Sequence, residues 1–538
     1  MEFEFSYKNL SKLDKILQRF FEILPAAISW TILLALTVVC FVRPLIAAVI
    51  TIAFSFYWFL RLLYMAISFV LRCSRLELES QANWPERARG LNRIYTYWKE
   101  LNDLEAASKT KQDISFLIHR KEMRLLEKSK QKAPQLDDIH HLIIIPVSDN
   151  QENLISKTVT SLIGGNFPSI RMVVVLAFEP GVSENAKLSN RRLIERYRDK
   201  FFDFLTVACS AESQTGKSFK GAILSQAASQ AANYFKEKKI AHENVITSSL
   251  EPGALVNPDH YSCLTYRFMV LPSRQLACFQ AIAAYDVSLW RASAPGRVLN
   301  AAASFFQIIE AVHPDNLIIF SSFSVSLATL LELKFWPSDL ISADLSFFWK
   351  AFINFNGAFT INPLYVTYPI TMDIAGDSSD SVSELYKKKC NLAYAGENLP
   401  IVMRALLRIG RMPFLKKIIC AFKLLEAQIL PAVWPFIIFI IGWLPALLSG
   451  REFSDSGIYY SAPRITFVIF ALMTACFIIS IVLTSLVFPR KKSKLGFFNQ
   501  ISQFFALIFL VPVGIFLTAA ATLSVQTNLM LGKHPKPQ

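Results

Sequence analysis

Apolar residues are distributed unevenly along this chain. Two long apolar segments, Leu24–Val42 and Leu45–Leu71, lie near the N-terminus and are separated by Arg43 and Pro44. Arg61 interrupts the second segment and must snorkel or face other protein. Three further apolar segments follow residue 428, at Leu430–Leu448, Ile465–Phe488 and Phe504–Leu523. Each segment is long enough to cross a membrane as a helix, so the pattern predicts a membrane protein with a polar central part.

Basic residues beside these segments predict the orientation. The loop with Arg490, Lys491, Lys492 and Lys494 should be cytosolic, because Lys and Arg are disfavoured on the translocated side. Counting spans backwards also places residues 72–428 on the cytosolic side. We therefore expect an integral protein of the cell (inner) membrane with a cytosolic central domain, and a first segment that is a retained anchor rather than a signal peptide.

The central part alternates short apolar runs with helical patterns. His141–Val147 has the continuous apolar character of a buried parallel strand. Further strands are expected at 172–177, 204–208 and 245–247, with helices at 153–163 and 218–236. This alternation predicts an α/β domain with a doubly wound, mostly parallel sheet.

A helical pattern with a different character precedes the third apolar segment. Phe414, Ile418 and Phe422 share one face, whereas Lys416 and Lys417 fall away from it. This pattern favours an interfacial helix on the cytosolic leaflet, although a domain helix packed on the sheet would show it too. The predicted organisation is therefore an N-terminal region with two transmembrane helices (1–72), a cytosolic helical connector (73–135), an α/β domain (136–410), an interfacial amphipathic helix (411–429), and three transmembrane helices with a tail (430–538).

Composition and net charge limit the kinds of partner that we expect this chain to bind. Of the 538 residues, 53% are hydrophobic and 18% are charged, which excludes a purely soluble protein. The net charge of +15 is spread over the cytosolic flanks without a nucleic-acid-binding motif, so we expect contacts with membrane lipids and none with nucleic acid. The eight cysteines are isolated from one another, and the seven histidines lack metal-ligand spacing.

In open parallel sheets ligands bind beyond the carboxyl ends of the strands, so the residues that follow the apolar runs are the informative ones. The segments of interest are Ile145–Leu154, Thr160–Leu162, Asn166–Pro168, Gly216–Lys217, Asn257–Tyr261, Phe320–Asp344 and Pro369–Pro400. Together these segments resemble those of membrane-bound family-2 glycosyltransferases. The resemblance implies a fold of the nucleotide-diphospho-sugar transferase (GT-A) type, a nucleotide-sugar donor and a lipid-linked or polysaccharide acceptor.

The chain departs from three motifs of that family, and in one of them Ala343 replaces the acidic residue that precedes Asp344. The family usually holds a divalent cation with an Asp-any-Asp pair, but Glu251, Pro252 and Gly253 stand here, and no Asp occurs between residues 203 and 259. Mg²⁺ or Mn²⁺ would therefore be held only weakly, and we assign no metal ligand or cofactor. The closing Gln-any-any-Arg-Trp motif is replaced by Lys389–Ala393, and no Trp occurs between residues 349 and 434.

Several residues still fit roles that the resemblance implies. Asp344 stands where the family has its general base. Lys387, Lys388 and Lys389 offer positive charge to a diphosphate. The residues expected around the nucleotide-sugar are Pro146, Asp149, Asn150, Glu179, Gly216, Lys217 and Glu251.

Each of these residues also has a plainer interpretation. Asp344 could cap a helix, Glu251 and Glu179 could be turn residues beside proline, and the three lysines could form a solvated face. Ala211–Ser218 fits a loosened phosphate-binding loop, but its first glycine is missing and no strand ending in Asp follows, which disfavours a nucleoside triphosphatase.

Two functions therefore remain open. The chain is either a membrane-embedded glycosyltransferase that transfers a sugar to a membrane-proximal acceptor, or a catalytically inactive relative. The inactive relative would act as a binding or scaffold protein in the assembly of an envelope glycan.

Overall fold

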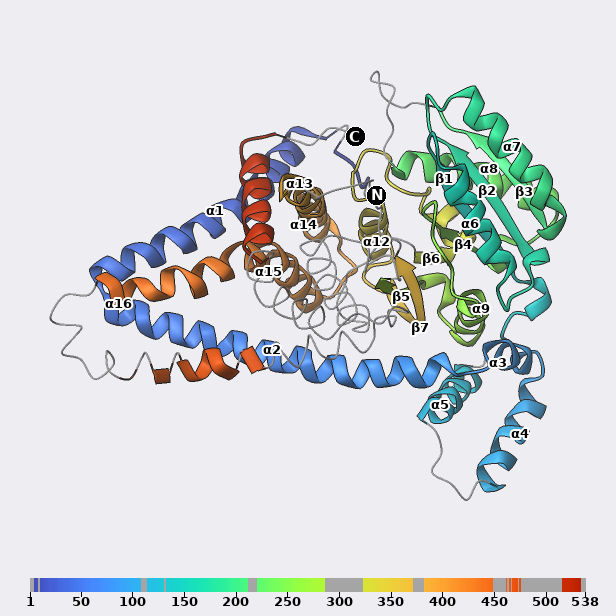
Figure 1. Cartoon of the computed structure of the whole chain (residues 1–538), viewed down its shortest axis with the longest axis horizontal. Helices are drawn as coiled ribbons and strands as arrows, with labels where there is room; N and C mark the ends of the chain where they lie inside the picture. The colour runs from blue at the N-terminus through green and yellow to red at the C-terminus, as the bar shows by residue number, and fades with distance from the viewer. Residues whose placement is uncertain are drawn as a thin grey trace, which may run out of the picture.

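A computed structural model shows long apolar helices beside a mixed sheet (Figure 1). It describes residues 4–7, 10–107, 114–129, 132–210, 220–285, 323–370, 382–448, 461, 464–465, 467–472, 474–475 and 515–533. The predicted spans Ile465–Phe488 and Phe504–Leu523 lie largely outside the described residues, and so do the basic loop at 490–494 and the phosphate-loop-like segment 211–218.

The sheet has seven strands in the order β3-β2-β1-β4-β6-β5-β7. Strand β1 pairs in parallel with β2 and β4, and β2 pairs in parallel with β3, whereas β6 runs antiparallel to β4 and β5. The strands are β1 (His140–Val147), β2 (Met172–Phe178), β3 (Asp203–Ala208), β4 (Val245–Ser249), β5 (Ala277–Tyr285), β6 (Phe323–Ser326) and β7 (Thr360–Ile370).

Helices cover both faces of this sheet. In β1, Leu142 and Ile144 belong to one apolar cluster, whereas Ile143 and Ile145 belong to the other, as the two-residue period of a strand requires. The first cluster includes residues of α8 (Lys220–Glu237), α12 (Ala343–Asn354) and α14 (Asn398–Arg408). The second includes residues of α3 (Trp84–Leu91), α6 (Glu152–Ile163), α7 (Glu184–Tyr197) and α9 (His260–Val270). The prediction of a doubly wound, mostly parallel α/β sheet is confirmed.

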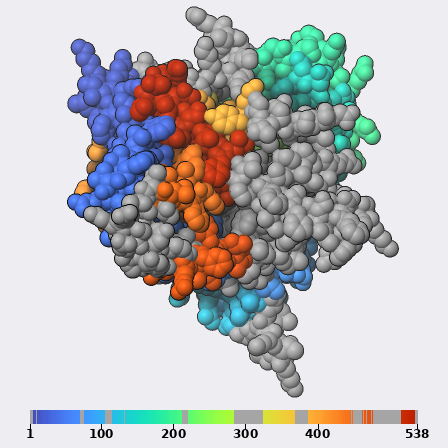
Figure 2. Space-filling view, turned by 60° about the vertical axis from the view of Figure 1, so that its left-hand side comes forward, coloured from blue at the N-terminus to red at the C-terminus, as the bar shows by residue number. Residues whose placement is uncertain are grey.

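Within the described residues, three helices are long and apolar enough to cross a membrane: Lys12–Val42, Pro44–Ser68 and Phe414–Trp443. The first two are α1 (Lys12–Val42) and most of α2 (Pro44–Ser80), and the break falls at Arg43 as expected. Pro44 begins α2, where its missing N–H leaves no hydrogen bond unmade. Residues of α1, α2, α15 (Phe414–Phe439) and the helix Ile515–Met530 share an apolar cluster. Figure 2 shows these blue, orange and red helices side by side.

One continuous helix, α15, covers the expected interfacial helix at 411–429 and the start of the expected span from residue 430. This helix continues through Pro431 and Pro435. After α15 the chain forms a short 3-10 helix, Ile441–Trp443, and then α16 (Leu444–Leu448). The apolar face of the first part of α15 is exposed, with Phe414 77% and Phe422 66% accessible, so this face is not packed on the sheet.

Arg61 in α2 faces protein, which was one of the two expected outcomes. Its guanidinium Nη1 lies 2.5 Å from Oε1 of Glu426 in α15 and also donates to the hydroxyl of Tyr57. A charge within an apolar helix is tolerated when a neighbouring helix supplies its partner. The pair therefore joins α2 to α15 within the helical bundle.

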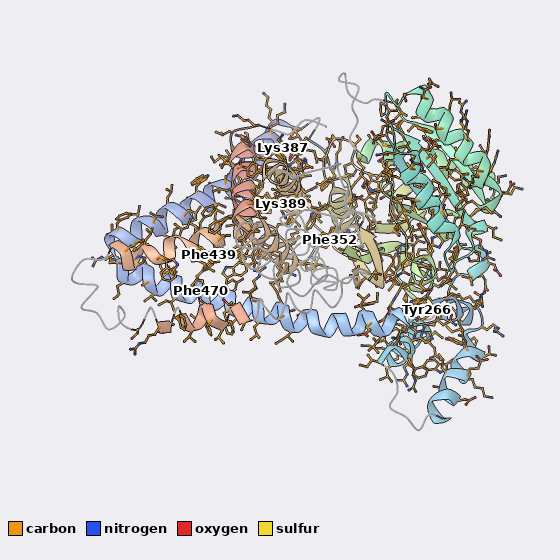
Figure 3. All side chains as sticks on the ribbon, viewed as in Figure 1. Tyr266, Phe352, Lys387, Lys389, Phe439 and Phe470 are labelled. Atoms are coloured by element: carbon orange, nitrogen blue, oxygen red, sulfur yellow. The ribbon has the colours of Figure 1, made fainter. Side chains whose placement is uncertain are left out.

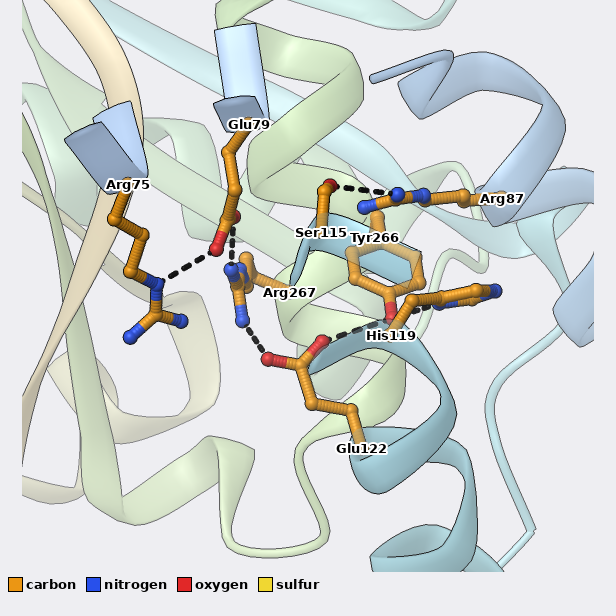
Figure 4. Close-up of polar contacts among 8 residues, drawn as sticks. All are labelled: Arg75, Glu79, Arg87, Ser115, His119, Glu122, Tyr266 and Arg267. Carbon is orange, nitrogen blue, oxygen red and sulfur yellow. Dashed lines mark hydrogen bonds and ion pairs between the residues drawn. The ribbon is translucent and has the colours of Figure 1, made fainter. Parts of the chain in front are cut away.

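A buried ion cluster joins α2 to the sheet domain (Figure 4). Arg267 of α9 donates from Nη2 to Oε2 of Glu79, at 2.6 Å, and from Nη1 to Oε1 of Glu122 in α5 (Ile114–Ser129). Glu79 lies near the end of α2 and is 1% exposed, and Arg75 donates to its other oxygen at 2.8 Å. Two carboxylates from separate helices thus neutralise a guanidinium whose side chain is 9% exposed.

Two hydrogen-bonded aromatic hydroxyls extend this cluster. Tyr266 donates to Glu122 at 2.9 Å and also bonds Nδ1 of His119 at 2.6 Å, while Nε2 of His119 bonds the hydroxyl of Tyr97. Burial, with help from nearby Arg87 and Arg267, lowers the pKa of His119 to about 3. His119 is therefore neutral near pH 7 and adds no positive charge beside Arg267.

We predict that Arg267→Leu lowers the free energy of unfolding by about 3–5 kcal/mol, because it leaves Glu122 without its cationic partner and leaves Glu79 with Arg75 alone. Chemical unfolding of the detergent-solubilised protein measures this. The control is Lys187→Leu in the exposed Lys187–Glu184 pair, where the change should stay below about 1 kcal/mol. Equal effects of the two substitutions would contradict the docking role of Arg267.

Candidate functional site

Three charged side chains meet beyond the carboxyl ends of the parallel strands. Lys220 is the first residue of α8, Glu251 follows β4 by two residues, and Asp344 lies in the first turn of α12. The ammonium of Lys220 lies 2.5 Å from Oε1 of Glu251 and 3.4 Å from Oδ2 of Asp344. This edge is where open α/β sheets bind their ligands, so we take the three residues as the candidate site.

A tight turn fixes the position of Glu251. The N–H of Leu250 donates to the carbonyl of Ile144, which prolongs the pairing of β4 with β1. The N–H of Ala254 then donates to the carbonyl of Glu251 at 3.1 Å, and Gly253 has a φ of +87°. Pro252 followed by a glycine with positive φ is typical of a type II turn. Turn-forming residues therefore occupy the place of the family's metal-binding pair.

Asp344 is not the cap of α12, because Ser342 holds that position. The side chain of Asp344 is buried, and its Oδ1 has no hydrogen-bond partner among the described residues. Burial raises the pKa of Asp344 above its ordinary value, and the charge of Lys220 opposes that rise. The plainer interpretation as a capping residue is thus excluded, whereas a role as general base remains a proposal.

Lys220 is the site residue that sequence reasoning did not identify. It stands at the start of the predicted helix 218–236, where a lysine is ordinarily solvated. Burial alone would lower the pKa of Lys220, but the charges of Asp344 and Glu251 raise it above its ordinary value. The ammonium therefore remains charged at neutral pH.

Close packing holds the start of α8 against the segment before α12. A Cβ atom on Gly221 would lie 2.1 Å from the carbonyl oxygen of Pro337. Ser225 of the next turn donates to the carbonyl of Trp336 at 3.1 Å. Because Gly221 follows Lys220 directly, these contacts set the distance between the ammonium and Asp344.

Glu397 holds the end of the segment before α12 in place. Its Oε1 accepts hydrogen bonds from the N–H groups of Ile341 and Ser342, at 2.8 and 3.0 Å, and from the hydroxyl of Ser342. Asn398 donates to that hydroxyl at 2.7 Å. Burial raises the pKa of Glu397 to about 7 even though these hydrogen bonds lower it. Glu397 is thus a positioning residue for the first turn of α12.

The other residues expected around a nucleotide-sugar lie near the ends of β1 and β2. Pro146 is buried within β1, and the N–H of Glu179 donates to the carbonyl of Val147. Asn150 has a φ of +62°, a left-handed conformation that asparagine tolerates. Asp149 accepts from the N–H and hydroxyl of Ser183, which lowers its pKa. No described hydrogen bond or ion pair joins these residues to Lys220.

The three lysines expected to meet a diphosphate belong to α13 (Val382–Ala393). Lys387 is exposed and Lys389 is partly buried, and burial lowers the pKa of Lys389. Figure 3 shows both on this helix, between the long apolar helices and the sheet. In the described part of the chain neither contacts Glu251 or Asp344. The side chain of Lys388 is outside the described residues, as are Gly216 and Lys217.

The described residues contain no cluster of three or more His, Cys, Asp or Glu side chains that could hold a metal ion. Glu251 and Asp344 are two such groups, and Lys220 lies between them. Mg²⁺ in proteins is often held by one or two carboxylates together with substrate phosphates. The pair could serve a metal in that way if the ammonium were absent.

No known family model and no curated protein sequence matches this chain significantly. Among solved structures, it is similar to the mannosyltransferase PcManGT from Pyrobaculum calidifontis in complex with GDP-Man and Mn²⁺, with 13% identity and a TM-score of 0.39 over 75% of this chain and 98% of that chain. It is also similar to S. aureus TarS 1–349 in complex with UDP, with 14% identity and a TM-score of 0.34 over 64% and 89% of the two chains.

A third similar structure is GalNAc-T7 with UDP, GalNAc and Mn²⁺, at 10% identity and a TM-score of 0.30 over 57% of each chain. The fold class rests on the strand order, and the site rests on its contacts.

We predict that Gly221→Ala moves the start of α8 and lowers the free energy of unfolding by about 1–3 kcal/mol, because the new methyl group would overlap the carbonyl of Pro337. Thermal unfolding measures the change. Gly410→Ala is the control, because nothing lies within 4 Å of its added Cβ. Equal stability of the two variants would show that α8 is free to shift.

Glu397 predicts a pH effect of defined sign. A carboxyl whose pKa is about 7 in the folded state resists ionisation there, so its destabilising contribution is full above pH 7 and fades as the pH falls towards its unfolded value. Relative to Glu397→Gln, the wild type should therefore gain about 2–3 kcal/mol between pH 8 and pH 5. Urea unfolding at both pH values measures this. A constant difference between the proteins would refute it, and the exposed Glu184→Gln supplies the flat control.

Proposed function

We propose that this chain is a membrane-embedded protein of the glycosyltransferase type that binds a nucleotide-sugar at the site formed by Lys220, Glu251 and Asp344. The observation that carries the proposal is the convergence of these three charged residues at the carboxyl edge of the parallel sheet. Two of them occupy positions that match the metal and base positions of family-2 glycosyltransferases in sequence. A GT-A type of fold accounts for both facts.

Asp344 is the general base of the proposed reaction. It takes the proton of an acceptor hydroxyl, whose oxygen forms a bond to the anomeric carbon of the sugar. The bond between that carbon and the diphosphate breaks, and the nucleoside diphosphate leaves with the electron pair. The raised pKa of Asp344 suits this role, because a base works best when its pKa lies near the working pH.

The acceptor of the proposed reaction lies at the membrane surface. Helices α1, α2 and α15 have the length and composition of membrane spans, and the exposed apolar face at the start of α15 suits the cytosolic leaflet. A lipid-linked or emerging polysaccharide acceptor fits this arrangement. The proposed location is the cell (inner) membrane, with the sheet domain in the cytosol.

A second function is favoured by one specific observation. Asp344 is already paired with Lys220, and a turn replaces the metal-binding pair, as expected for a relative that no longer transfers sugar. Such a protein would bind a partner or a glycan in envelope glycan assembly.

Substitution of Asp344 separates the two functions. We predict that Asp344→Asn lowers the release of nucleoside diphosphate from a nucleotide-sugar by about 100-fold or more, because the base is lost. The assay uses purified protein, UDP- and GDP-sugars and a membrane lipid extract as acceptor. Asp138→Asn, an exposed site, should leave the rate unchanged. Wild-type protein that binds nucleotides without releasing product would support the second function.

A further inference from the structure

The ammonium of Lys220 has bonding capacity that its two partners do not use. An ammonium carries three N–H donors, and in the described part of the chain Lys220 pairs with Glu251 and Asp344. Its side chain is 29% exposed, so the third donor can reach a ligand. Beside it, Oδ1 of the buried Asp344 also lacks a hydrogen-bond partner among the described residues.

Two carboxylates that lie close together are stable only when a cation offsets their mutual repulsion. Like charges this close repel one another, and the burial of Asp344 strengthens the repulsion, whereas Glu251 is 54% exposed. Proteins supply the missing positive charge with a metal ion or with a basic side chain. Here a nitrogen atom lies within 3.4 Å of both carboxylates, and so it occupies the point from which a bound ion would contact them.

We propose that the Lys220 ammonium is the built-in cation of this cleft, in the place where a divalent metal ion would otherwise join Glu251 and Asp344, and that the cleft binds a nucleoside diphosphate through it without any metal. The nucleotide part rests on the proposed function. The exclusion of a metal does not, since it depends on the three side chains alone.

The packing around α8 fixes the backbone from which Lys220 reaches the two carboxylates. Gly221 has no room for even a methyl group against Pro337, so the helix cannot slide towards the segment before α12. Ser225 fastens the next turn to Trp336. A metal would have to displace a tethered charge rather than enter an open site. A diphosphate oxygen, by contrast, needs only the remaining N–H donor and the positive charge.

Removal of the lysine should turn the cleft into a metal site. We predict that full-length Lys220→Met in detergent binds Mn²⁺ at millimolar or lower concentration, observed as loss of the free Mn²⁺ signal in electron paramagnetic resonance. The wild type, Lys220→Arg and the exposed control Lys236→Met should not bind it. Adding Glu251→Gln to Lys220→Met should abolish the gained binding, because a second carboxylate is then missing.

Nucleotide titrations test the other half of the proposal. Wild-type protein should bind UDP or GDP equally well in EDTA and in Mn²⁺. Lys220→Met should bind about 10- to 100-fold more weakly in EDTA, because a charge-assisted hydrogen bond is lost, and should recover part of the affinity with Mn²⁺.

The outcomes separate the two claims. Mn²⁺ binding at the cleft of the wild type, or wild-type nucleotide binding that requires Mn²⁺, overturns the role of Lys220 even if Lys220→Met does not fold. A folded Lys220→Met that gains no Mn²⁺ also overturns it. A third outcome is that Lys220→Met gains Mn²⁺ binding but neither it nor the wild type binds a nucleotide. That outcome supports Lys220 as the cation of the site and contradicts the proposed function.

Discussion

The ammonium of Lys220 is held at the edge of the sheet by Glu251 and Asp344, which lie beside it. A charge that is partly removed from water is costly unless opposite charges compensate it. The same constraint acts at Arg267, which lies between Glu79 and Glu122. In each cluster the three residues come from three separate elements. Compensation of charge therefore fixes how those elements meet.

The two ion clusters have different roles in the fold. Arg267 fastens the sheet domain to the end of the long helix α2, and so sets the position of the domain relative to the apolar bundle. Lys220 joins α8 to the turn after β4 and to the start of α12, and so brings the three site residues together. Between them lies the parallel sheet, whose alternating apolar side chains need helices on both faces.

Much of the sheet could be predicted from the sequence, and some could not. Strands β1 and β2 are nearly continuous apolar runs, and β3 and β4 contain shorter apolar segments beside helical patterns, which is why their positions were evident. Strand β7 contains Pro363 and Pro369, which argue against a strand except at a sheet edge, and β7 lies at the edge. Helix α15 continues through Pro431 without a break at residue 429, where the pattern predicts a change from an interfacial helix to a span.

The candidate site could be predicted only in part, because two of its three residues could be identified in the sequence and the third could not. Glu251 follows a recognisable strand, and Asp344 was marked by the resemblance of Phe320–Asp344 to a known family. Lys220, by contrast, is a lysine at the start of a helix, with no local pattern to mark it. Its partner Asp344 is 124 residues away, and only the packing of three elements brings the pair together. The lysines of α13 looked better suited to a diphosphate, because consecutive charges are visible in a sequence and spatial pairing is not.

One structure determination tests the central claim directly. The purified protein would be crystallised or imaged with a nucleoside diphosphate and excess Mn²⁺. Our account predicts that the side chain of Lys220 lies between Glu251 and Asp344 and contacts a phosphate oxygen, with no Mn²⁺ anomalous signal at that point. A Mn²⁺ ion that joins the two carboxylates, with Lys220 displaced into solvent, would contradict it.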